Sequence, residues 1–180
     1  MNEIAFNPQN ITDFLKKSTL SPVILCIGTD RVCGDALGPL IGTMLTDRFN
    51  TPSFVYGTLA SPVTALNLNT AVDFIKSRHP SSPVIAIDSC VGKASEIGKI
   101  RLFYGGIKPG LATGKDLPRV GDISITATVA QSGNENSLFK VSLSLVYELS
   151  LAVAKAIDQA LYSLKSDSNS TTHKYNTTAL

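Results

Sequence analysis

The sequence contains no Trp, only two His and only three Cys among its 180 residues. It also has no apolar run of the roughly 18 residues that a bilayer-spanning helix needs. The formal net charge is +2, and no basic run with interleaved aromatics occurs, which argues against nucleic acid as a partner. The first ten residues lack the basic head and apolar run of a signal peptide. We therefore expect a cytoplasmic protein that binds neither nucleic acid nor a membrane.

The few cysteines also limit the chemistry. Cys26, Cys33 and Cys90 form no C-x-x-C pair, and their odd number argues against a disulfide framework. Cys26 lies inside an apolar run, so we expect it in the core. Cys33 and Cys90 each lie close to an aspartate in the sequence, and a thiolate or soft-metal site built from these residues is an open alternative.

Several nucleotide-binding and catalytic motifs are missing. The glycine-rich segment 28–39 contains neither G-x-x-x-x-G-K-S/T nor G-x-G-x-x-G, and the carboxylate of Asp35 would repel a phosphate there. No Ser lies in a G-x-S-x-G elbow, and no His is positioned to act as its base. These absences exclude phosphate binding at this turn and a Ser or Cys catalytic triad.

The apolar pattern that is present predicts alternating strands and helices. Strands are expected at 23–29, 53–58, 83–88, 99–104 and 122–129, and helices at 10–18, from 35 to about 49, from Leu68 to the His79-Pro80 step, and at 140–165. The first three strands alternate with helices, which is typical of a parallel sheet. The short connection between 88 and 99 predicts that the fourth strand runs antiparallel. We expect a single α/β domain at residues 1–165 and a disordered tail at 166–180.

Two aspartates follow apolar strands and form the candidate site. Asp35 comes after the strand at 23–29, and Asp88 ends the strand at 83–88. In open α/β sheets the carboxyl ends of the strands form the ligand crevice, so neighbouring strands would bring both carboxylates to one site. Asp35 is alternatively a helix N-cap, and Asp88 a buried Asp bonded to loop amides. As a pair, Asp35 would be the base of lower pKa and Asp88 the proton carrier in acid–base peptide hydrolysis.

Other charged residues border this site. Asp30 and Arg31 flank the loop and form either a surface ion pair or a substrate-orienting group. Lys108 and Lys115 lie on the long loop 105–121, where they are either solvated or in contact with an acidic peptide. A loop of this length in a compact domain is typical of a binding loop or a lid.

Three separate segments resemble a known family. These are 27-IGTDRVCGDALGPLIG-42, 84-VIAIDSC-90 and 106-GIKPGLATGK-115. They resemble the germination protease of spore-forming bacteria, and more strongly the smaller YyaC-type spore proteases. The resemblance implies a three-layer α/β/α fold of the phosphorylase/hydrolase-like type, shared with hydrogenase-maturation endopeptidases. It further implies a five-stranded mixed sheet of order 2-1-3-5-4 with strand four antiparallel.

The same resemblance implies roles for residues. Asp35 and Asp88 match the family's catalytic aspartates, and Thr29 stands where the family has Asn. With Thr29, we expect Asp30 and Lys108 to contact substrate. The implied activity is hydrolysis of a peptide or small protein in the sporulating cell or forespore, and the family also suggests a homo-oligomer.

The resemblance also bears on whether the protein binds a metal ion. Hydrogenase-maturation relatives bind one through two carboxylates and a His, but His79 ends a helix away from the crevice and His173 lies in the tail. We therefore expect no metal and no cofactor. The leading hypothesis is an aspartic-type endopeptidase. The alternatives are a non-catalytic peptide-binding or structural spore protein with the same fold, and metal-assisted hydrolysis at the same carboxylates.

Overall fold

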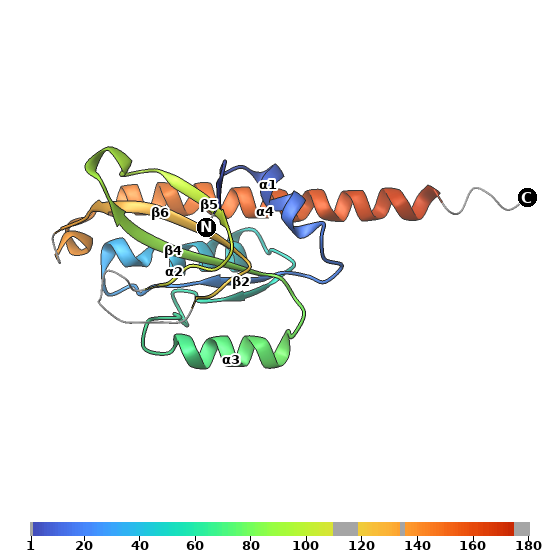
Figure 1. The fold of residues 1–180 in the computed structure, drawn as a ribbon, viewed down its shortest axis with the longest axis horizontal. Coiled ribbons are helices and arrows are strands. Elements are labelled where there is room, and N and C mark those ends of the chain that lie inside the picture. Colours follow the sequence, from blue (N-terminus) through green and yellow to red (C-terminus); the bar gives the residue numbers. More distant parts are fainter. Residues whose placement is uncertain (1, 110–118, 134–135, 175–180) are drawn as a thin grey trace, which may run out of the picture.

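The computed structural model describes residues 2–109, 119–133 and 136–174 and contains one six-stranded mixed sheet (Figure 1). The strands are β1 (Asn2–Ile4), β2 (Val23–Cys26), β3 (Phe54–Tyr56), β4 (Val84–Gly92), β5 (Ile100–Tyr104) and β6 (Ile123–Gln131). Their order is β1-β5-β6-β4-β2-β3. The ladders from β3 through β2 and β4 to β6 are parallel, whereas β5 is antiparallel to both β6 and β1.

Helices cover both faces of this sheet (Figure 1). They are α1 (Pro8–Leu15), α2 (Leu37–Thr43), α3 (Leu68–Arg78) and α4 (Leu143–Lys174). Residues of α1, α2 and α4 share one core with Ile85 and Ile87 of β4, and α3 shares a second core with Ala86. Successive side chains of a strand point to opposite faces, so these two cores lie on opposite sides of the sheet. The described helices include none that is long and apolar enough to cross a membrane.

The predicted count of five strands is wrong. The segment Asn2–Ile4 pairs with β5 as a sixth, edge strand. Three residues contain too little alternation to indicate a strand in the sequence, and this one is defined by its partner. The other five strands keep the expected order, and β5 is antiparallel as expected.

Several predicted boundaries also differ from the structure. β2 ends at Cys26, whereas β4 continues past Asp88 to Gly92. The helix expected from residue 35 is a run of three short pieces, η1 (Cys33–Ala36), α2 and the π-helical η2 (Met44–Arg48). α4 continues to Lys174, so the tail expected to be disordered begins as helix, and residues 175–180 lie outside the described part.

Candidate active site

The carboxyl ends of β2 and β4 border a cleft of about 1230 Å³. The two strands are parallel neighbours, with Cys26 opposite Ile87. Asp35 and Asp88 both line this cleft. The structure therefore brings the two aspartates to one crevice, at the edge of the sheet where α/β proteins usually bind ligands.

A glycine fixes the backbone of Asp35. Gly28 has a φ of +142°, and a Cβ atom at this position would lie 2.0 Å from the carbonyl oxygen of Asp35. The Thr29 N–H donates to this same oxygen at 3.1 Å, and the Asp35 N–H donates to the Val32 carbonyl at 2.9 Å. Only glycine combines this φ with so close an approach, so the loop that carries Asp35 is held against the end of β2.

The interpretation of Asp35 as a helix N-cap is wrong. Val32 is the cap of η1, no side chain caps it, and Asp35 lies inside the turn. Thr29 and Ser89 of β4 are instead the polar neighbours that act on the Asp35 carboxyl, and all three residues line the cleft. The side chain of Asp35 is therefore directed toward β4 at Ser89.

The structure gives the direction of the Asp35 pKa, whereas its order relative to Asp88 stays a prediction. Burial raises the pKa of its carboxyl above the ordinary value of 3.8, and the hydrogen bonds from Thr29 and Ser89 lower it by less. Burial removes water from the charged form, and the described residues place no cation beside Asp35 to compensate. The carboxyl is thus biased toward holding a proton.

Asp88 approaches the cleft from the other face of β4. It is 9% exposed and lies opposite Thr126 of β6, which also lines the cleft. Strand alternation places Asp88 on the α3 side of the sheet, like Ala86, and Ser89 on the α2 side, like Ile87. Because Ser89 is the β4 residue that acts on the Asp35 carboxyl, the two carboxyl groups reach the cleft from opposite sides of β4.

The other predicted site residues also border the cleft. Thr29, Asp30 and Lys108 all line it. The Thr29 hydroxyl donates to the Asp30 carboxylate at 3.5 Å and accepts the Arg31 N–H at 3.3 Å. The ion pair considered between Asp30 and Arg31 is not formed in the described structure. Lys115 lies in the segment 110–118, outside the described residues.

Sequence reasoning missed Ser89 and the apolar rim of the cleft. Ser89 follows Asp88 directly, and its alternation to the opposite face was the available signal. Leu66 and Phe139 line the cleft with 85% and 62% of their surface exposed. No periodic pattern identifies them, since both lie in connections rather than in the predicted elements.

The donor set does not fit a metal that needs three protein ligands. Within residues 2–109, 119–133 and 136–174, no three His, Cys, Asp or Glu side chains form a group that could hold a metal ion. His79 lies outside the cleft lining, and its Nε2 is 2.7 Å from the Tyr56 hydroxyl. The side chain of His173 is outside the described part. We therefore derive no step through a metal.

The cysteines divide between core and cleft. Cys26 is fully buried, as expected, and this burial raises the pKa of its thiol. Cys33 packs against the core of α2 and α4, whereas Cys90 lines the cleft. The alternative thiolate or soft-metal site would need Cys33 and Cys90 in one group with the aspartates, and no such group exists among the described residues.

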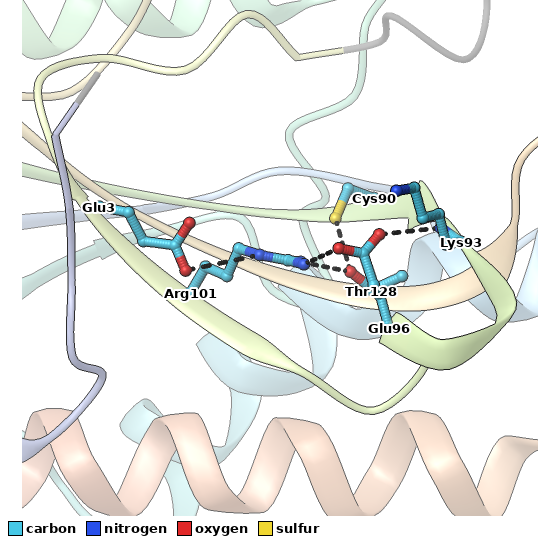
Figure 2. A network of polar contacts seen from close by, with 6 residues as sticks. All are labelled: Glu3, Cys90, Lys93, Glu96, Arg101 and Thr128. Carbon is cyan, nitrogen blue, oxygen red and sulfur yellow. Dashed lines mark hydrogen bonds and ion pairs between the residues drawn. The ribbon is translucent and has the colours of Figure 1, made fainter.

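A second polar cluster lies beside the cleft, and Figure 2 shows it. We call it the Arg101 network, and its members are Glu3, Cys90, Lys93, Glu96, Arg101 and Thr128. Arg101 donates to the Glu96 carboxylate at 2.6 Å and to the buried Thr128 hydroxyl at 2.8 Å, and its Nε lies 3.6 Å from Glu3. The Lys93 amide hydrogen bond and the charge of Arg101 hold the pKa of Glu96 below its ordinary value.

Comparison with known proteins gives the family. Residues 3–156 match the family described as "Protein of unknown function (DUF1256)", and the chain belongs to this family. The protein YyaC of Bacillus subtilis (strain 168), described as uncharacterized, is 42% identical over 124 residues. That alignment covers 68% of this chain and 60% of YyaC.

Solved structures give the fold type. The NiFe hydrogenase maturation protease HycI from Thermococcus kodakarensis KOD1 is similar with a TM-score of 0.53 and 19% identity, over 85% of this chain and 99% of HycI. A hydrogenase 2 maturation peptidase from Thaumarchaeota archaeon SCGC_AB-539-E09 has a TM-score of 0.48 and 17% identity, over 81% of this chain and 99% of its own. At this identity the likeness to HycI supports a shared mixed α/β fold.

Proposed function

We propose that this DUF1256 protein is an endopeptidase of the aspartic type, with Asp35 and Asp88 as its catalytic pair. The observation that carries the proposal is that both carboxyl groups line one cleft at the carboxyl ends of adjacent parallel strands. The fold similarity to a maturation protease is consistent with a peptidase but says nothing about the type of its catalysis.

In the proposed mechanism the two carboxyl groups have different roles, one holding a proton and the other accepting one. The raised pKa of Asp35 suits it to hold this proton, which reverses the assignment expected from the sequence. Asp88 takes a proton from water, whose oxygen attacks the carbonyl carbon of the scissile bond. Asp35 donates its proton to the leaving nitrogen, the C–N bond breaks, and a carboxylic acid and an amine result.

The substrate in this proposal is a peptide or small protein. Thr29, Asp30 and Lys108 line the cleft beside the aspartates, and we assign them to substrate contact. The resemblance to spore proteases suggests action in sporulation or germination, so the small acid-soluble proteins of spores are the first substrates to test. Self-association also stays a prediction.

The test is cleavage of these spore proteins and of a proteome-derived peptide library, read by mass spectrometry. We expect Asp35→Asn and Asp88→Asn each to lower the cleavage rate by about 10³-fold, the scale of a lost general acid or base. Both variants should keep the wild-type circular dichroism spectrum. Full activity in either variant contradicts the proposal.

The apolar rim of the cleft favours a second candidate, a peptide-binding protein without catalysis. Leu66 and Phe139 expose apolar surface at the cleft. Binding of a peptide on this apolar surface does not require the aspartates. This candidate predicts that library peptides bind with unchanged affinity to Asp35→Asn and Asp88→Asn, and that no protein in the series cleaves them.

A further inference from the structure

We propose that the cleft takes its peptide as an added β-strand, paired with the free edge of β4 at Ser89. The catalytic part of this inference rests on the proposed function, whereas the mode of binding does not. It identifies the ligand class as an extended, unfolded segment, which the chain recognises through its backbone.

The hydrogen bonds of β4 show which edge its residues face. The carbonyl oxygens of Pro83 and Ile87 accept the N–H groups of Val23 and Ile27, at 2.9 and 2.8 Å, so odd-numbered residues face β2. The carbonyl oxygen of Val84 accepts the Asp122 N–H at 2.8 Å, so even-numbered residues face β6. Ser89 follows Ile87 by two positions, and its N–H and C=O therefore point to the β2 side.

The contact of the β2 segment with β4 ends before Ser89. The last β2–β4 pair is Cys26 with Ile87, and the last hydrogen bond between the two segments in the described residues is the one from the Ile27 N–H to the Ile87 carbonyl. β4 itself continues to Gly92, paired with β6. No backbone hydrogen bond to the Ser89 peptide groups on the β2 side is found in the described part of the chain. Among the described residues, the β2-side edge of β4 at Ser89 therefore has no strand partner where it borders the cleft.

An extended peptide fits this edge both in spacing and in chemistry. It would lie about 4.8 Å from β4 and exchange hydrogen bonds with the N–H and C=O of Ser89. Asp88 and Asp35 reach the cleft from the two sides of β4, so they would flank the added strand on its two faces. This arrangement separates the proton acceptor for water from the proton donor for the leaving nitrogen.

The rim of the cleft matches the alternating side chains of such a strand. Leu66 comes two positions before the α3 core residue Leu68, and Phe139 follows Leu138, which packs on the opposite core. Both exposed side chains line the cleft. Side chains of an added strand point alternately to these two faces, so we infer a preference for apolar residues at alternating positions.

The first experiment tests the backbone of the ligand. The probe is the library peptide that the wild type cleaves fastest or, if none is cleaved, the peptide that Asp88→Asn retains best in an affinity selection. Each amide nitrogen of the probe is N-methylated in turn, which removes one donor at a time. We expect one position to lose at least about 10-fold in kcat/KM or affinity, and its two neighbours, which face away from β4, to lose far less.

The second experiment tests the backbone of the protein. Ser89→Pro removes the N–H and the hydroxyl, whereas Ser89→Ala removes the hydroxyl alone. Proline is tolerated at an edge where the N–H is outside the ladder, so Ser89→Pro should fold. We expect its KM or Kd to exceed that of Ser89→Ala by about 10-fold. If Ser89→Pro fails to fold, the N-methyl scan on the wild type decides alone.

The outcomes separate this inference from the proposed function. Cleavage with a single sensitive amide supports both, and binding with a single sensitive amide but no cleavage supports the added strand and overturns the peptidase. Cleavage with a flat N-methyl scan and equal Ser89→Pro and Ser89→Ala overturns the added strand and leaves the peptidase intact. Neither binding nor cleavage of any library peptide overturns both.

Discussion

Two clusters of polar residues involve neighbouring positions of β4, one at Ser89 and the other at Cys90. They differ in their balance of charge. The Arg101 network, which includes Cys90, joins a cation to two carboxylates and satisfies the buried Thr128 hydroxyl. The site around Asp35 and Ser89 has a half-buried carboxyl group with no cation beside it among the described residues. The pKa of Glu96 is accordingly lowered, and that of Asp35 is raised.

This difference separates a cluster with balanced charges from a carboxyl group that has no balancing cation among the described residues. A network whose members satisfy one another stabilises the native state and holds its charges fixed. A half-buried carboxyl group without a cation costs stability in its charged form, and its pKa is raised. The comparison therefore predicts that substitutions in the two groups will have opposite effects on activity and stability.

The largest expected effect is on cleavage. Asp35→Asn should lower the rate by about 10³-fold and leave the melting temperature unchanged or raised, because the buried charge is removed. Glu96→Gln, the matched amide substitution in the Arg101 network, should keep wild-type cleavage and lower the melting temperature. Cleavage assays and thermal melts on both variants check this, and equal loss of cleavage in the two would remove the distinction.

The next largest effect is expected on stability, from substituting one glycine beside each of the two groups. Gly28→Ala should destabilise the protein by about 3 kcal/mol, because its Cβ would overlap the Asp35 carbonyl at a positive φ. Gly98→Ala, at a φ of +88° beside the Arg101 network, meets no atom within 4 Å. It should cost only about 1 kcal/mol from backbone strain. Urea titration of both variants measures the difference, and similar losses would contradict the close packing of Gly28.

A smaller effect is expected from breaking the Arg101 network itself. Arg101→Met leaves the carboxylates of Glu96 and Glu3 and the buried Thr128 hydroxyl without their donor. We expect a loss of about 2 kcal/mol, typical of hydrogen bonds to charged groups, with cleavage unchanged. Chemical denaturation and the library assay test both parts. A stable but inactive variant would place Arg101 in the catalytic machinery instead.

The smallest expected effect is on the pH dependence of stability. The pKa of Asp35 is raised in the folded state, so its favourable contribution is complete below 3.8 and is lost as pH rises through the folded value. For Glu96, whose pKa is lowered, the contribution is present above 4.5 and is lost as pH falls through the folded value. Asp35→Asn should thus gain stability relative to wild type as pH rises, and Glu96→Gln should lose it. Denaturation series between about pH 3 and 7 check the two signs.

The sequence was sufficient to predict the succession of the main helices and strands along the chain, because their apolar patterns are local and strong. The run before Asp88 predicts a buried strand, and the short link to the next strand predicts its antiparallel direction; both are confirmed. It failed for β1 because an edge strand of three residues depends on the neighbour with which it pairs. It also failed for the end of β4, since pairing with β6 extends that strand to Gly92.

What the sequence by itself determined is the alternation of apolar segments and the position of an aspartate after each of two of them. Only the tertiary structure decided that both aspartates border one cleft and that burial raises the pKa of Asp35. The physical reason is the range of the interactions. Periodicity and turn preferences act between near neighbours in the chain, whereas desolvation and strand pairing depend on residues that only folding brings together.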